Sequence, residues 1–387
     1  MKKKILINEF LSSLFKVLKG KKRPLFLHEP SLNSKDKESL INCFKTNKIS
    51  TAGIFTKRFE DQIKKFTKSK YVLTVINGTS ALHLAIIALG IKKDEEILIP
   101  SLTFAATGHA VLYNHSIPHF FDINENLTVD TLKLDKYLKK ITINRNGKCI
   151  NKKSKRIIRA IIPMHTFGHV CEMDKLKKLA TKYNLFIIED AAEALGSFYK
   201  KKHAGTFGDI GVLSFNGNKI ITTGMGGAIL TKSKKFFDKS KHIAATSKLK
   251  KKWEYVHDQL GYNYRLPSIN ASIGLSQMKR INFFLKKKRN LFQKYKKEFS
   301  KLNFLKIFEE QKNIRANYWL QTVVLNKNYE NLLNLILKKC HQEKILIRPS
   351  WKPLHQLNHF KKFPKMNLDS TNSLAKRIIN LPSSSFL

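Results

Sequence analysis

Short apolar runs recur between residues 70 and 230, and each has the length of a buried β-strand. The runs are YVLTVI at 71–76, EEILIP at 95–100, IPHFFDI at 117–123, IIRAIIPM at 157–164, LFIIED at 185–190 and IGVLSF at 210–215. Helical stretches such as SALHLAIIALGI at 80–91 and MDKLKKLATKYN at 173–184 separate several of them. This alternation predicts an α/β fold with a mostly parallel sheet and helices on both of its faces.

The pattern changes after about residue 270 and predicts a smaller α+β domain. Residues 271–300 predict one long, lysine-rich linking helix. Shorter elements follow it: NYWLQTVVL at 317–325 and ILIRPS at 345–350 as strands, and ENLLNLILKKCHQEK at 330–344 as a helix. We therefore divide the chain into an N-terminal extension (1–25), a large domain (26–270), and the linking helix with a small C-terminal domain (271–387). The polar segment RNGKCINKKSKR at 145–156 predicts a surface loop.

The large positive net charge of the chain does not by itself indicate a nucleic-acid partner. The chain has 73 Lys and Arg against 28 Asp and Glu, a formal net charge of +45. Such an excess usually indicates nucleic acid or an anionic membrane as a partner. Here the lysines are spread along the whole chain, without a helix-turn-helix, zinc-finger or RNP-like aromatic pattern. We therefore expect a basic surface and no nucleic-acid partner. The four cysteines lie far apart in the sequence, so neither a metal site nor a disulfide framework is expected.

The N-terminus, MKKKILINEFLSSLF, begins like a signal peptide. Asn8 and Glu9 interrupt its apolar run, and no small-residue cleavage site follows. No stretch approaches the ~18 apolar residues that a membrane span requires. We expect a cytoplasmic protein without a transmembrane segment, whose first 20 or so residues form a basic amphipathic extension that contacts a membrane or another protein.

Candidate chemistry follows the strands, because ligands of parallel sheets bind beyond the strands' carboxyl ends. After the first strand, Asn77-Gly78-Thr79-Ser80 opens a helix and offers backbone N–H groups and hydroxyls to a phosphate. An ordinary helix cap at Thr79 or Ser80 is the alternative. After the second strand, Phe104 is suited either to stack on a flat ring or to fill the core.

Two further strand ends carry ionisable groups. Glu189 and Asp190 end an apolar strand, where a buried carboxylate needs a partner. For Asp190 that partner is either a protonated ring nitrogen or the backbone of a helix it caps. Lys219 lies in SFNGNKIITTGMGG, just after the strand that ends at Ser214. An interior lysine is a candidate nucleophile for a carbonyl cofactor. A phosphate cradle, a stacking ring, an acid and a lysine at one sheet edge are the groups that pyridoxal 5′-phosphate requires.

These segments resemble the DegT/DnrJ family of nucleotide-sugar aminotransferases, which have PLP-dependent transferase fold type I. The resemblance runs from about residue 26 to the C-terminus. It rests most on NGTSALHLAIIALG, IPSLTFAAT, IIEDAAEALGS, GTFGDIGVLSFNGNKIITTG and GYNYRLPSINASIGLSQ. FLHEP, SFNGNKIITTG and LGYNYR are most similar to the branch that aminates UDP-linked 4-keto-6-deoxy-N-acetylhexosamines, as in legionaminic acid pathways.

The resemblance implies a role for each matching residue. Lys219 would bind the cofactor covalently and move protons, and Asp190 would pair with the pyridine nitrogen. Glu193 would contact the phenolic side of the cofactor, and Phe104 would stack on its ring. The phosphate would be held by Thr79, Ser80, Ser214 and, from the other subunit of a homodimer, Asn263. Weaker candidates for the substrate site are His165, Arg265, Arg348 and His355.

The resemblance also implies L-glutamate as amino donor and a keto sugar nucleotide as acceptor. Two alternatives stay open. A related branch dehydrates sugars at carbon 3, but it replaces the lysine with histidine. A non-catalytic or regulatory protein that kept the fold would not need both Lys219 and Asp190.

Overall fold

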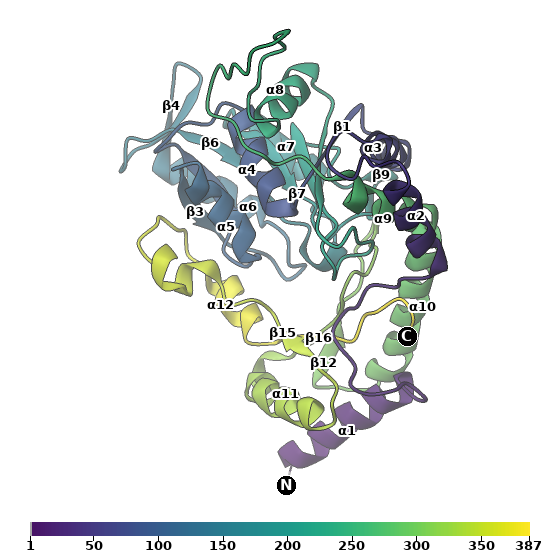
Figure 1. Cartoon of the computed structure of the whole chain (residues 1–387). Coiled ribbons are helices and arrows are strands. Elements are labelled where there is room, and N and C mark those ends of the chain that lie inside the picture. Colours follow the sequence, from purple (N-terminus) through teal and green to yellow (C-terminus); the bar gives the residue numbers. More distant parts are fainter. Residues whose placement is uncertain (1) are drawn as a thin grey trace.

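The computed structural model describes residues 2–387 and has two regions, of which the larger is built on a seven-stranded sheet (Figure 1). The strand order is β1-β11-β10-β7-β6-β2-β3. The strands are β1 (Tyr71–Val75), β2 (Glu96–Pro100), β3 (Ile117–Phe121), β6 (Ile158–Ile161), β7 (Phe186–Asp190), β10 (Ile210–Ser214) and β11 (Gly227–Thr231). β11 runs antiparallel to β1 and β10, and the pairs from β10 across to β3 are parallel.

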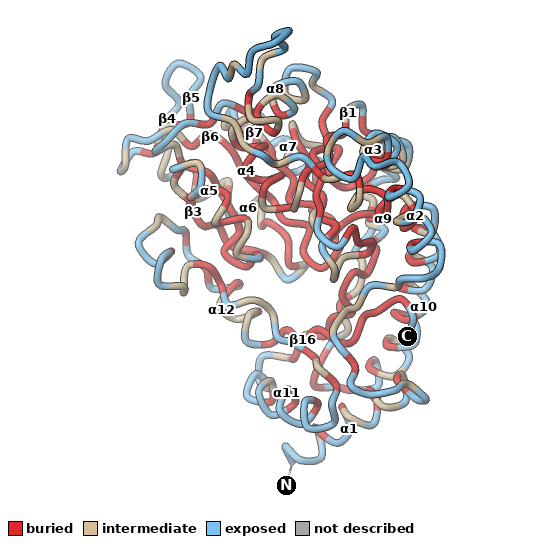
Figure 2. The backbone as a smooth tube through the Cα atoms, in the orientation of Figure 1, coloured by how far each residue is buried: buried red, intermediate tan, exposed pale blue. Residues whose placement is uncertain are grey.

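The α/β fold and its mostly parallel sheet are confirmed, and each of the six apolar runs contains one strand. β11 was not predicted, because its five residues follow a glycine-rich loop and have no helix before them. Helix α4 (Gly78–Ala88) packs against β1, β7, β10 and β11. Its residues are almost all buried, so its position relative to the strand ends is fixed (Figure 2).

Two local predictions were wrong. Residues 271–300 form two helices, α9 (Ser268–Lys279) and α10 (Ile281–Phe299), because the Arg280 backbone leaves the helical region at φ −107° and ψ 5°. The Arg280 side chain is bound to Asp36 (Nη2–Oδ2 2.5 Å), which is 5% exposed and far away in the sequence. This contact between residues distant in the sequence lies at the break between α9 and α10.

The segment 145–156, predicted as a loop, contributes to a hairpin of β4 (Thr142–Arg145) and β5 (Lys148–Asn151). Asn146 and Gly147 form its two-residue turn with φ of 52° and 71°. Positive φ at both turn positions is typical of the Asn-Gly turns that match the twist of paired strands.

The smaller region has a four-stranded antiparallel sheet in the order β12-β14-β16-β15. Its strands are β12 (Leu305–Ile307), β14 (Gln321–Leu325), β15 (Arg348–Pro349) and β16 (Ile378–Leu381). Helix α11 (Leu333–Gln342) and the C-terminal half of α10 complete this core.

The N-terminal residues belong to this second core. Helix α1 (Lys2–Val17) lies against α10 and α11 (Figure 1). Phe10 and Leu14 are fully buried, and the Phe10 ring meets Phe299 edge-on at 5.2 Å between centroids. The helix is amphipathic as expected, but its apolar face is covered by this chain and not by a membrane or another protein.

The domain boundary at residue 270 stays a prediction. Side chains on both sides of it pack in the first core, which includes Phe284, Leu354 and Phe360. Within residues 2–387, every helix is too short or too polar to span a bilayer.

Candidate active site

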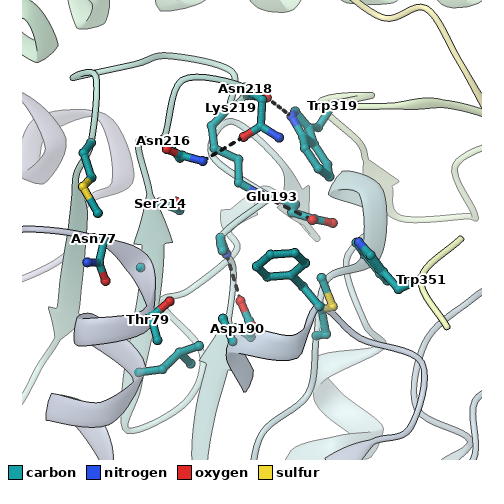
Figure 3. A pocket seen from close by; sticks show the side chains of 17 residues that line it. Asn77, Thr79, Asp190, Glu193, Ser214, Asn216, Asn218, Lys219, Trp319 and Trp351 are labelled. Atoms are coloured by element: carbon teal, nitrogen blue, oxygen red, sulfur yellow. Dashed lines mark hydrogen bonds and ion pairs between the residues drawn. The ribbon is translucent and has the colours of Figure 1, made fainter. Parts of the chain in front are cut away.

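A cavity of about 280 Å³ lies at the carboxyl ends of β1, β7 and β10 (Figure 3). The residues that follow these three strands line it together with Phe104, Met164 and Met225. The C-terminal part of the chain closes it with two tryptophans. The polar and aromatic lining residues are Asn77, Thr79, Phe104, Asp190, Glu193, Ser214, Asn216, Asn218, Lys219, Trp319 and Trp351.

The start of α4 forms one wall of the cavity. Asn77 is the helix cap, and its Oδ1 accepts from the Ser80 backbone N–H at 2.7 Å. The cap is therefore neither Thr79 nor Ser80. The N–H groups of Gly78 and Thr79, in the first turn, have no partner within the helix. A Cβ added at Gly78 would lie 3.0 Å from the Ser214 Cβ, so glycine permits this close approach. Such a helix start suits a phosphate.

Asp190 is 3% exposed and reaches the cavity from the end of β7. Its Oδ2 accepts from the Thr107 hydroxyl at 2.7 Å, and its Oδ1 from the Ala192 backbone N–H at 3.2 Å. Both donors are neutral, so the carboxylate keeps its charge available for a cation in the cavity.

The neighbouring Glu189 faces the other way, since successive strand residues point to opposite faces. Its oxygens accept from the backbone N–H groups of Gly205, Phe207 and Gly208. Burial alone would raise the pKa of Glu189, but hydrogen bonds from His165 and from these N–H groups hold it below its ordinary value.

Lys219 points into the cavity between a carboxylate and an indole. Its Nζ lies 3.3 Å from Glu193 Oε1 and 4.0 Å from the centroid of the Trp319 ring. Glu193 Oε2 also accepts from the Phe167 N–H at 2.9 Å. Burial raises the pKa of Glu193 to about 7, although Lys219 and the Phe167 N–H both act in the opposite direction.

Phe104 is 54% exposed and lines the cavity, so it does not belong to the core. Its nearest aromatic neighbour is Trp351, at 6.4 Å between centroids. Ser80 contributes its N–H to the Asn77 cap and does not line the cavity.

The structure does not bring the four weaker substrate candidates to this cavity. His165 is fully buried beneath it; its Nε2 donates to Glu189, and its Nδ1 accepts from the Cys171 N–H. His165 therefore supports the sheet end. His355 bonds the Ser101 hydroxyl through Nδ1 (2.6 Å), and the exposed Arg348 lies beside His341. Arg265 lines a separate cavity next to β1.

Asn263 is exposed on the surface of its own chain, outside the cavity. Sequence reasoning did not select Thr107, Asn218, Trp319 or Trp351. It named Asn77 only as part of the segment that opens a helix, although asparagine between a strand and a helix is a preferred cap.

Comparisons with known proteins identify the family of this chain. The family model of the DegT/DnrJ/EryC1/StrS aminotransferase family matches residues 30–387. A GDP-perosamine synthase of Escherichia coli O157:H7 is 36% identical over 92% of each chain. A UDP-4-amino-4,6-dideoxy-N-acetyl-beta-L-altrosamine transaminase of Campylobacter jejuni is 29% identical over 91% of this chain and 90% of its own. The structure of PseC from Helicobacter pylori, an aminotransferase involved in the biosynthesis of pseudoaminic acid, superposes with a TM-score of 0.84. It is 26% identical and covers 93% of this chain and 94% of its own.

Fold and site thus define a PLP-dependent sugar aminotransferase. The chain belongs to the DegT/DnrJ/EryC1/StrS aminotransferase family.

The lining residues fit pyridoxal phosphate. Asp190 is a buried carboxylate with only neutral donors, the α4 start is an anion cradle, and Lys219 is an amine that lines the same cavity. When bound, the cofactor supplies an electron sink next to the reacting amine.

Proposed function

We propose that this chain transfers the amino group of L-glutamate to a UDP-linked 4-keto-6-deoxy-N-acetylhexosamine, for cell-surface glycan synthesis in the cytoplasm. The observation that carries the proposal is the convergence of Lys219 and Asp190, from two adjacent strands, on one cavity (Figure 3). FLHEP, SFNGNKIITTG and LGYNYR support this choice of sugar branch.

The lining residues then divide the tasks of binding and proton transfer. Lys219 holds the cofactor and its Nζ takes and returns protons. Asp190 keeps the ring nitrogen protonated, and Glu193 contacts the phenolic side. Thr79, Ser214 and the first N–H groups of α4 hold the phosphate, and Phe104 stacks on the ring. The basic surface favours the approach of a diphosphate-bearing substrate.

The active protein is a homodimer in this proposal, with Asn263 of the partner subunit reaching the phosphate. The exposed position of Asn263, outside the cavity of its own chain, is compatible with that role.

A GDP-linked sugar is the second candidate, because the 36%-identical relative is a GDP-perosamine synthase. The test offers UDP-, GDP- and dTDP-linked 4-keto-6-deoxy sugars to the glutamate-treated enzyme, and follows the cofactor spectrum and the product mass. We expect amination of the UDP sugar. Preferential amination of the GDP sugar would reassign the nucleotide, and a reaction with none of them would contradict the proposal.

The two alternatives from the sequence are less well supported. A dehydratase of this family has histidine at the lysine position, and here Lys219 is present. A binding protein would have no use for a lysine in the same cavity as Asp190. A purified protein that is yellow with bound cofactor and turns over glutamate excludes both.

A further inference from the structure

Trp319 is the aromatic residue in contact with the Lys219 amino group, yet it follows helix α10 and is far from Lys219 in the sequence. It is 4% exposed and lies just before β14. Three hydrogen bonds fix it. Its backbone N–H donates to Asn317 Oδ1 (2.8 Å), its carbonyl accepts from Lys288 Nζ (2.6 Å), and its indole Nε1 donates to the Asn218 carbonyl (2.6 Å).

The partners of Trp319 are themselves anchored. The Asn317 side chain donates to the carbonyls of Glu193 (2.8 Å) and Leu195 (2.9 Å), so Trp319 is tied to the loop that carries Glu193. Lys288 is 1% exposed and also donates to the Ser383 carbonyl. Burial lowers the pKa of Lys288 well below its ordinary value, and its amino group donates to the two carbonyls.

This scaffold sets the position of the Lys219 amine. The indole face lies on one side of Nζ at 4.0 Å, and Glu193 Oε1 lies at 3.3 Å. An ammonium over an indole face is attracted by the ring's negative charge, and tryptophan gives the strongest such contact. Without these two contacts, a lysine with four rotatable side-chain bonds would sample many positions.

We propose that Trp319 is a positioning residue whose indole holds the Lys219 amino group beside Glu193 whenever that group is not bonded to the cofactor. The inference rests on the proposed role of Lys219 as the lysine that binds the cofactor and moves protons. In that role the amine must return to one place in every cycle, and a fixed indole provides that place.

Other ionisable groups near Lys219 act differently. Asp190 lines the same cavity, but the carboxylate in contact with the Lys219 amine is that of Glu193. The His28 ring lies 6.4 Å from the Trp319 ring. Burial is the main cause that lowers the pKa of His28 well below its ordinary value, and the nearby Lys288 and Lys219 lower it further. His28 is therefore neutral near pH 7. Glu193 and the indole are therefore the contacts that attract the ammonium.

The test measures the reactivity of Lys219 in the full-length, cofactor-free chain, so it is independent of the sugar substrate. Brief acetylation with acetic anhydride is followed at the Lys219 peptide by mass spectrometry across a pH series. The limiting rate at high pH reports access to the amine. The pH of half-maximal rate reports how strongly its surroundings favour the ammonium.

We expect Trp319→Leu to lower the pH of half-maximal rate and to accelerate labelling near neutral pH by about threefold or more. Trp319→Phe keeps an aromatic face and should lie between this variant and the wild type. Trp351→Leu is the matched control: it removes an indole that lines the same cavity but packs on Phe167 (centroids 5.0 Å apart), and it should leave the half-maximal pH unchanged.

An unchanged half-maximal pH in Trp319→Leu, or an equal fall in Trp351→Leu, would overturn the proposal. Circular dichroism checks each fold, and Trp319→Met replaces the leucine variant if that one does not fold. In the single-turnover half-reaction with glutamate, Trp319→Leu should lower the limiting rate while the glutamate concentration for half-maximal rate changes little; the reverse pattern would also contradict the positioning role. Failure of the sugar panel alone would leave the labelling result intact.

Discussion

The Thr107 hydroxyl lies 2.7 Å from Asp190 Oδ2 and joins helix α5 (Ala105–Tyr113) to the end of strand β7. Thr107 is fully buried, and its hydroxyl is also 2.9 Å from that of Thr103. Because the other oxygen of Asp190 accepts from the Ala192 N–H, the carboxylate is held at both oxygens. The orientation of the acid proposed to meet the cofactor thus depends on a helix 83 residues away in the sequence.

Asp190→Asn should weaken catalysis far more than folding. A neutral amide cannot keep the ring nitrogen protonated, so we expect a loss of ~2–4 kcal/mol in transition-state stabilisation. kcat/KM with glutamate and urea unfolding measure the two effects. Thr107→Val keeps the Asp190 carboxylate but removes one of its hydrogen bonds, so its loss of kcat/KM should be smaller than that of Asp190→Asn. Thr107→Ser keeps a hydroxyl and should retain most of the wild-type kcat/KM. A normal rate for Asp190→Asn would move the role to another acid.

Lys219→Ala and Lys219→Arg should both abolish transamination and leave the fold intact. The amine is needed to bind the cofactor and to move protons, and a guanidinium stays protonated and does neither. The measurements are the absorbance of the bound cofactor, the glutamate half-reaction and the circular dichroism spectrum. Turnover at the wild-type rate in either variant is incompatible with the assignment.

Glu193 should make the stability of the cofactor-free chain depend on pH. The pKa of this carboxyl is about 7 in the folded chain, against an ordinary value of 4.5. Between these two values the folded chain keeps a proton that the unfolded chain has released, so the free energy of unfolding falls as pH rises through the window. Glu193→Gln removes this titration. The free energy of unfolding of the variant, measured with urea and compared with that of the wild type, should rise by on the order of 2 kcal/mol as the pH increases from about 4.5 to 7. Parallel pH profiles for the two proteins would refute the shifted titration.

A mixture of Lys219→Ala and Asn263→Asp chains should regain activity that neither variant has alone. If Asn263 acts across the dimer, each mixed dimer has one site with both residues intact. Random exchange of equal amounts should then restore about a quarter of the wild-type activity. Sedimentation and mass-tagged chains show whether exchange occurs. Proven exchange without recovery, or an active monomer, rules out shared sites.

Helix α1 should contribute to stability through its buried face. Phe10→Ala removes a fully buried ring that packs on Phe299, and we expect a loss of ~3–5 kcal/mol in the free energy of unfolding. Ile5→Ala is the control. Because Ile5 is 51% exposed, this change should lower the free energy of unfolding only slightly. Equal effects of the two changes in urea unfolding would contradict the packing of α1.

Sequence alone determined the parallel strands of the large region and the groups at their ends. Buried parallel strands are continuous apolar runs, and their carboxyl ends must share one edge of the sheet. Asp190, Glu193, Ser214 and Lys219 were selected on this basis together with the family resemblance, and the structure brings all four to one cavity. The direction of β11 was not predictable, since five apolar residues do not say which way a strand runs.

Tertiary structure decided what depends on contacts between distant residues. The break at Arg280 coincides with a bond to Asp36, 244 residues away, and the indole over Lys219 comes from residue 319. The family resemblance suggested His165 as a substrate-site candidate, but its ring is buried and donates to Glu189. Periodicity and turn chemistry are local, whereas these contacts exist only once the chain has packed, and so only the folded structure reveals them.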